Sequence, residues 1–124
     1  TEAAKTHIAA GADALTGSSQ SVVGSINAAK DAGTVLWFGT QQDQASLAPK
    51  NVVASQQYDW VGILKQMIEN RKNGKLGGEA FVLELKNAGL KIVYNPGYQL
   101  PDDVKKAAEA AIEGIKSGSI KVEP

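Results

Sequence analysis

The segment TVLWFGTQQDQ, residues 34–44, decides the fold that we expect for this chain. Its apolar part, Val35–Phe38, does not alternate apolar with polar residues, which is typical of a strand covered on both faces of a parallel sheet. Three glutamines and an aspartate follow directly, within Gly39–Gln44. Neutral amides are poor acid–base groups, but they donate and accept hydrogen bonds. The segment therefore predicts a buried strand that ends in a hydrogen-bonding loop.

Helical and strand patterns alternate along the whole chain. Helices are predicted over Glu2–Ala10, Val22–Ala32, Trp60–Asn70 and the stretch that begins at Pro101. Strands are predicted over Ala12–Thr16, Val35–Phe38, Val52–Ser55, Ala80–Leu85 and Leu90–Tyr94, the last two as a hairpin. This alternation predicts one α/β domain over residues 1–124: a three-layer, mainly parallel sheet with helices on both faces.

Some side chains have an expected structural role. Ser21 is a candidate N-cap for the helix Val22–Ala32, and Asp59 is a candidate cap for the helix after it. Trp60, Leu64 and Ile68 recur at helical spacing and are expected to be buried, as is the apolar stripe of the last helix.

Three polar segments follow the predicted strands, namely Thr16–Ser21, Gly39–Gln44 and Ser55–Asp59. The carboxyl ends of parallel strands meet at one edge, where open α/β sheets bind ligands. The candidate ligand-binding residues are therefore Ser18, Ser19, Gln20, Gln41, Gln42, Asp43 and Tyr58. All but Tyr58 would form hydrogen bonds, and Tyr58 would supply an apolar contact or stack on a flat ring.

The composition argues against several other classes. Thirteen basic and thirteen acidic residues cancel, so no strong field attracts nucleic acid. The chain has no cysteine and one histidine, His7, so neither a thiolate metal site nor a serine–histidine pair near Ser18 is predicted. We expect no cofactor, no metal and no catalytic residue.

Several stretches of the chain form a recognisable ordered set, namely Gly11–Thr16, Ala28–Gly33, Trp37–Thr40, Leu47–Pro49, Val52–Ser55, Asn73–Gly78, Leu100–Lys105 and Gly114–Ile120. In this order they resemble the basic membrane protein family, the PnrA-like substrate-binding lipoproteins of ABC transporters. Together they extend over nearly the whole chain.

The resemblance implies the type I periplasmic-binding-protein fold, in which two α/β lobes close on a ligand. Members are well over twice as long, so the chain resembles the carboxyl-terminal lobe, with the amino-terminal lobe absent. A permease partner, an extracytoplasmic location and a lipid anchor on the missing amino terminus are also implied. Characterised members bind purine nucleosides. Gln41 replaces their ribose-binding aspartate and Tyr58 replaces a lysine, so a free purine base or another polar ring compound is also a candidate ligand.

Two other functions remain open from the residues. One is a small α/β nucleoside-processing enzyme that uses Asp43 as acid or base. The other is a receiver-like sensor or interaction domain. Because the chain starts within a predicted helix, it reads as an excised domain, and an open strand edge would favour a homodimer of the isolated lobe.

Overall fold

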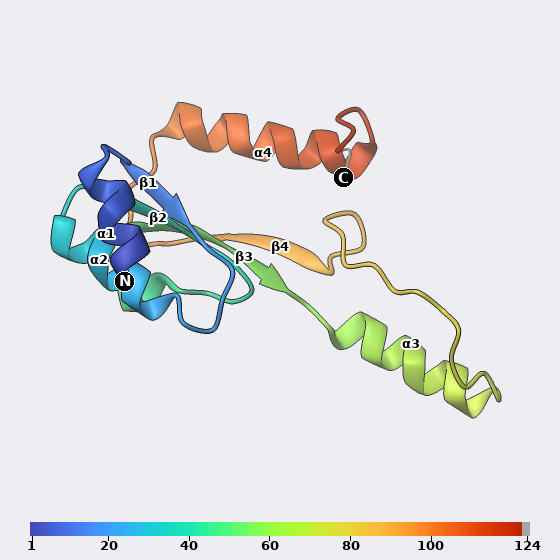
Figure 1. Ribbon diagram of the computed structural model, residues 1–124. Helices are drawn as coiled ribbons and strands as arrows, with labels where there is room; N and C mark the ends of the chain where they lie inside the picture. The colour runs from blue at the N-terminus through green and yellow to red at the C-terminus, as the bar shows by residue number, and fades with distance from the viewer. Residues whose placement is uncertain (123–124) are drawn as a thin grey trace. The chain divides into compact units, whose positions relative to one another are not determined.

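The computed structural model describes residues 1–122 (Figure 1). The elements follow one another as α1 (Glu2–Ala9), β1 (Ala14–Thr16), α2 (Val23–Ala32), β2 (Leu36–Gly39), the 3-10 turn η1 (Ala45–Leu47), β3 (Val52–Tyr58), α3 (Val61–Lys72), β4 (Leu90–Tyr94) and α4 (Asp102–Ser117). Each predicted helix is present, with ends within about two residues of the predicted ones.

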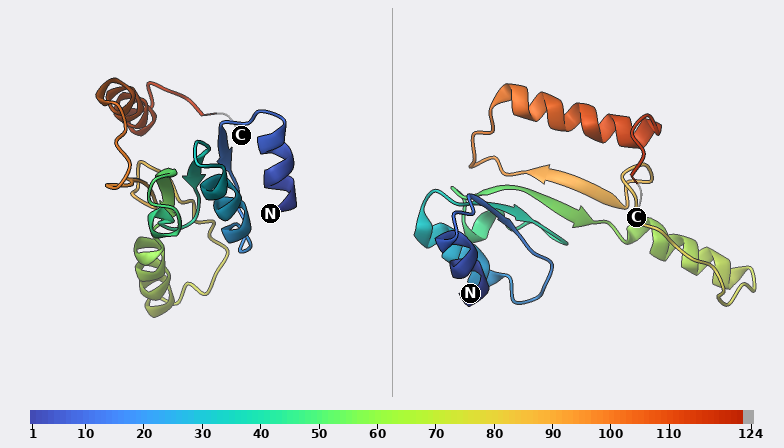
Figure 2. Two further views of the ribbon diagram at one scale, coloured as in Figure 1. Left: turned by 90° about the vertical axis from the view of Figure 1, so that its left-hand side faces the viewer. Right: turned by 45° about the horizontal axis from the view of Figure 1, so that its top comes forward.

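The four strands form one sheet in the order β1-β2-β3-β4. The first three are parallel, with Thr16 opposite Phe38 and Gly39 opposite Ser55. Strand β4 runs antiparallel to β3, as the arrows in Figure 2 show. The sheet is therefore mainly parallel, as predicted, with one antiparallel strand at an edge.

Two predictions about strands are wrong. Residues Ala80–Leu85 do not form a strand, so they make no hairpin with β4. Strand β3 continues to Tyr58 and takes in most of the polar segment that was expected to be a loop after Ser55. The reason is that β4 pairs with β3 instead: the backbone N–H of Asn95 donates to the carbonyl of Val53 at 3.0 Å.

The described chain divides into two compact units. The first comprises Thr1–Gln57 and Ile92–Pro101, and the second comprises Tyr58–Lys91 with the residues from Asp102 on. Each unit is described separately below.

The first unit contains the hydrophobic core. Ile26 of α2 packs against Trp37 of β2 and Val52 of β3, and all three side chains are fully buried. Helix α1 lies beside α2 (Figures 1 and 2), and the alanines Ala4 and Ala29 are buried there. Small side chains let the two helices approach closely. Trp37 is a core residue, as predicted from its place in the apolar run Val35–Phe38.

The second unit has almost no core of its own. Among its described residues, Ile63 is the one buried hydrophobic side chain. The predicted burial of the α3 stripe is wrong, since Trp60, Leu64 and Ile68 are each more than half exposed. Along α4 no residue is buried either, although its apolar side chains share one face as predicted. Among the described residues, no helix is both long and apolar enough for a membrane span.

Candidate ligand-binding site

The carboxyl ends of β1 and β2 lie side by side and begin the candidate site. Thr16 pairs with Phe38 in parallel register, and the hydroxyl of Thr16 donates to the carbonyl of Phe38 at 2.9 Å. The two strands point the same way (Figure 1), so the loops that leave them start from the same edge of the sheet.

Two hydrogen bonds then join these loops. The hydroxyl of Thr40 donates to the carbonyl of Gly17 at 2.6 Å. The side-chain Nε2 of Gln41 donates to the hydroxyl oxygen of Ser18 at 2.9 Å. Gln41 and Ser18 are exposed, so their remaining donors and acceptors face solvent. The structure thus brings together two of the three polar segments that the sequence predicted to converge.

The backbone at Gln41 has an uncommon conformation. Its φ angle is 73°, in the left-handed region, which residues other than glycine rarely adopt. The backbone N–H of Gln42 donates to the carbonyl of Thr40 at 2.9 Å, which closes a tight γ-turn around Gln41. A γ-turn with a positive central φ is strained, and such strain is concentrated at ligand-binding and active sites.

Gln44 differs from the two glutamines before it because its side chain is buried. Its Oε1 accepts a hydrogen bond from the indole Nε1 of Trp37 at 2.6 Å, and its Nε2 donates to the carbonyl of Thr40 at 3.0 Å. Its backbone N–H donates to the hydroxyl of Ser55 at 3.2 Å. The sequence analysis missed this role. The signal was present, since a buried tryptophan needs an acceptor for its N–H.

The other candidate residues of the first unit lie in the same two loops. The Oδ1 of Asp43 accepts the backbone N–H of Ala45 at 2.9 Å, just before η1. Ser19 accepts the backbone N–H of Ser21, and the two hydroxyls are 2.9 Å apart. Ser21 therefore closes a local turn, and its prediction as the cap of α2 is wrong, because Val22 occupies that position without a side-chain bond. Gln20 and Gln42 are exposed.

Tyr58 belongs to the second unit. Its ring meets that of Trp60 edge to face, with the ring centres 6.1 Å apart. Tyr58 is 38% exposed and Trp60 53% exposed, so part of each aromatic side chain is open to solvent. The sequence analysis assigned Trp60 to the core, and the structure places it at the surface.

Asp59 lies between these aromatic residues and has a structural role. Its Oδ1 accepts the backbone N–H of Val61 at the start of α3, and its Oδ2 pairs with the ammonium of Lys91 at 2.6 Å. The prediction that Asp59 caps α3 is wrong, because Trp60 occupies the N-cap position without a side-chain hydrogen bond. The hydrogen bond from Lys91, helped by the N–H of Val61, holds the pKa of Asp59 below its usual value. Asp59 is therefore ionised at neutral pH and is not a proton donor there.

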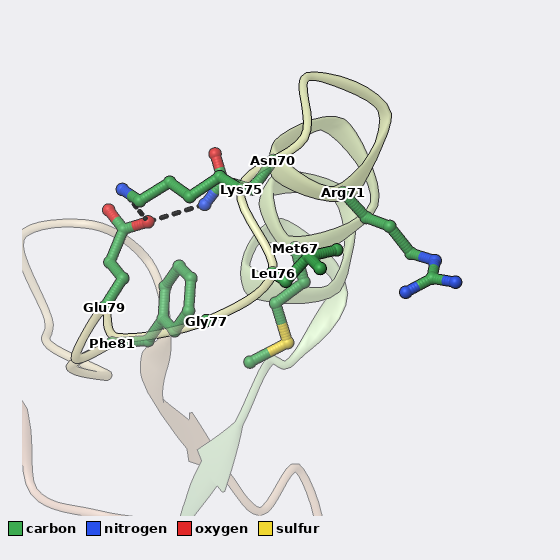
Figure 3. A pocket seen from close by; sticks show the side chains of 8 residues that line it. All are labelled: Met67, Asn70, Arg71, Lys75, Leu76, Gly77, Glu79 and Phe81. Atoms are coloured by element: carbon green, nitrogen blue, oxygen red, sulfur yellow. Dashed lines mark hydrogen bonds and ion pairs between the residues drawn. The ribbon is translucent and has the colours of Figure 1, made fainter.

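A second hollow lies entirely within the second unit (Figure 3). Its volume is about 300 Å³, and it is lined by Met67, Asn70, Arg71, Lys75, Leu76, Gly77, Glu79 and Phe81. Glu79 accepts hydrogen bonds from Lys75 and Asn70, and the Lys75 ammonium lowers the pKa of this carboxyl. Arg71 points away from Glu79 (Figure 3). The pocket contains none of the predicted ligand-binding residues.

The side chains of the described site are polar and, apart from the carboxylate of Asp43, uncharged. Amides and hydroxyls from Ser18 and Gln41 face solvent, and the carboxylate of Asp43 is engaged by a backbone N–H. Within residues 1–122, no cluster of three histidine, aspartate or glutamate side chains could hold a metal ion. The arrangement suits recognition through hydrogen bonds.

Comparison with known families identifies the chain. The profile of the Bmp family, described as "ABC transporter substrate-binding protein PnrA-like", matches residues 1–123. The chain belongs to this family. Comparison with curated protein sequences finds no match.

Several solved structures share the fold of this chain at low sequence identity. A solute-binding protein of an ABC transporter system from Conexibacter woesei is 23% identical, with a TM-score of 0.69, over 98% of this chain and 41% of that one. A corresponding protein from Aeropyrum pernix is 19% identical, with a TM-score of 0.79, over 99% and 44%. A structure described as a transcriptional activator of the comK gene from Bacillus halodurans is 17% identical, with a TM-score of 0.80, over 98% and 43%.

These likenesses confirm the predicted fold class, an α/β fold of the periplasmic-binding-protein type. This Bmp-family chain spans less than half the length of the structures it resembles. Substrate-binding proteins of the family deliver solutes to ABC transporters, are not enzymes and are extracytoplasmic.

Proposed function

We propose that this chain is part of the solute-binding component of an ABC importer, and that it captures a small, neutral, polar ring compound without chemical change. A purine nucleoside or a purine base is the proposed ligand class. The observation that carries the proposal is the bond between Gln41 and Ser18, which unites two loops into one exposed, uncharged hydrogen-bonding edge.

The donor and acceptor pattern of this edge favours a heterocycle. The Nε2 of Gln41 donates to Ser18, so the hydroxyl hydrogen of Ser18 is directed to another acceptor, and the Oε1 of Gln41 is left to accept. Ring nitrogens and exocyclic amino groups of purines offer the matching acceptor and donor. Asp43, Ser19, Gln20 and Gln42 would add contacts.

The proposed function also requires parts other than the described lobe. A permease partner, a lipid anchor and an additional lobe would all lie outside residues 1–124. The exposed apolar side chains of α3, namely Val61, Leu64, Met67 and Ile68, support an additional lobe because such a stripe is normally covered. In the isolated chain, a second copy would cover this apolar stripe. Light scattering on residues 1–124 should therefore detect dimers at high concentration.

The enzyme alternative has little support in the geometry. Asp43 is exposed and its carboxylate accepts the backbone N–H of Ala45, whereas an acid–base residue normally lies in a deep pocket beside its substrate. No observation favours the sensor alternative either.

Calorimetric titration of the full-length protein with purine nucleosides and bases tests the proposal. We expect binding, and we expect Gln41→Ala to weaken it about tenfold through loss of one hydrogen bond. Asn27→Ala, which removes an exposed amide from α2, is the matched control and should leave affinity unchanged. Residues 1–124 alone should bind more weakly than about 1 μM, since half a cleft leaves the ligand in water. Failure of every purine to bind would refute the ligand class.

A further inference from the structure

Gln44 is buried, and both ends of its side-chain amide form hydrogen bonds within the protein. The residue is 3% exposed, and its two side-chain partners are the buried indole of Trp37 and the carbonyl of Thr40. The indole N–H is a donor only, so the oxygen of the Gln44 amide must face Trp37 and the nitrogen must face Thr40. The orientation of this amide is thereby determined by its partners.

The carbonyl of Thr40 accepts two hydrogen bonds, and both hold the γ-turn around Gln41. One is the backbone N–H of Gln42, which closes the turn, and the other is the Nε2 of Gln44. The carbonyl of Thr40 and the N–H of Gln41 belong to one rigid peptide plane. By holding that carbonyl, Gln44 fixes the plane from which the φ of Gln41 is measured.

A buried support is needed because the turn is strained. Residues in the left-handed region persist only where the surroundings determine them. The γ-turn bond joins residues only two apart, and the Gln41–Ser18 bond lies at the exposed surface. The two bonds of Gln44 are the protected ones, anchored through Trp37 in the hydrophobic core.

We propose that Gln44 is a positioning residue for the ligand-binding edge. It holds the γ-turn at Gln41 through the carbonyl of Thr40 and so directs the Gln41 amide toward Ser18 and the ligand. This role rests on the proposed function, but Gln44 itself does not touch the ligand, because it lies beneath the loop. Gln44 thus determines the backbone geometry from which Gln41 reaches the ligand.

The test measures the φ of Gln41 and ligand affinity in the full-length protein. Gln44→Met keeps the length and removes both side-chain bonds, and Gln44→Asn is one methylene too short to make both. Asn51→Ala is the matched control, since it removes an equally buried amide elsewhere in the same unit. NMR couplings across the Gln41 backbone report φ, and titration with adenosine reports affinity.

In both Gln44 variants we expect Gln41 to leave the left-handed region and adenosine affinity to fall about tenfold. Asn51→Ala should lower stability and change neither quantity. A positive φ at Gln41 in a folded Gln44→Met or Gln44→Asn protein would overturn the proposal. If the unaltered protein does not bind adenosine, that result counts against adenosine as a ligand in the proposed function. The NMR couplings still decide the role of Gln44 at the γ-turn.

Discussion

The side-chain Nδ2 of Asn51 donates a 3.0 Å hydrogen bond to the carbonyl of Val35, at the start of the central strand. The same nitrogen lies 3.3 Å from the carbonyl of Ala29 and 3.2 Å from that of Gly33, at the end of α2. One buried amide therefore satisfies carbonyls that the end of a helix leaves without a donor.

Replacing Asn51 by alanine should destabilise the protein by about 2 kcal/mol or more, because buried carbonyls lose their donor. Urea unfolding of Asn51→Ala measures the change. Asn27→Ala, on the exposed side of α2, serves as the control and should change the free energy of unfolding by less than about 0.5 kcal/mol. Equal stability of the two variants would contradict the bridging role.

The γ-turn predicts different effects on stability for two small substitutions at Gln41. Gln41→Gly removes the steric cost of a positive φ, whereas Gln41→Ala keeps it. We expect the glycine variant to be more stable than the alanine variant by about 1 kcal/mol, as measured by calorimetric melting. Both variants lose the bond to Ser18, so both should bind ligand weakly. A more stable alanine variant would show that the turn is not strained.

Gly39 is packed too closely for a side chain. A Cβ atom at this position would lie 2.5 Å from the hydroxyl oxygen of Ser55 and 3.0 Å from the Oε1 of Gln44. Gly39→Ala should therefore cost about 1–3 kcal/mol through overpacking. In a Ser55→Ala background the cost should be smaller, because the closest atom is gone. A double-mutant cycle by denaturant unfolding measures this coupling, and strict additivity would argue against the contact.

The low pKa of Asp59 predicts a loss of stability in acid. The folded pKa lies below the unfolded one, so the ionised carboxylate stabilises the fold above the unfolded pKa, about 3.9. That contribution disappears as the pH falls through the folded pKa. Asp59→Asn keeps an oxygen that can accept the backbone N–H of Val61 but lacks the charge that Lys91 contacts, so its stability should vary less with pH below about 4. Chemical unfolding of both proteins from pH 7 to pH 3 provides the comparison, and identical profiles would exclude the effect.

Much of the first unit could be predicted from local sequence. The apolar run Val35–Phe38 identified strand β2, and parallel pairing then required the loops after β1 and β2 to begin at one edge. The expectation that both faces of this strand are covered is wrong, since Phe38 is 42% exposed while Trp37 is buried. The bond between Gln41 and Ser18 agrees with that reasoning, although it does not test ligand binding. Periodicity and the rules of parallel sheets were sufficient here because the contacts follow from strand order.

The second unit shows where local patterns fail. The spacing of Trp60, Leu64 and Ile68 correctly predicted a helix, but periodicity reports only that apolar residues share a face. It does not report whether another part of the molecule covers that face. Likewise, Ala80–Leu85 has the composition of a strand, yet β4 pairs with β3, and a choice between pairing partners is a long-range property.

The different roles of the individual glutamines could not be predicted from the local sequence pattern either. Gln41, Gln42 and Gln44 are chemically identical, and their spacing alone gave no reason to separate them. Their roles differ because Gln44 lies within reach of the Trp37 indole, whereas Gln41 reaches across to the neighbouring loop.

The indole bond of Trp37 gives the protein an internal optical probe. An indole that is 1% exposed and bonded to the loop amide should shift its emission when that amide reorients, and acrylamide should quench it poorly. Trp60, at 53% exposure, should be quenched readily, so the light that remains comes from Trp37. Movements of the loop after β2 should therefore be visible in solution without any attached dye.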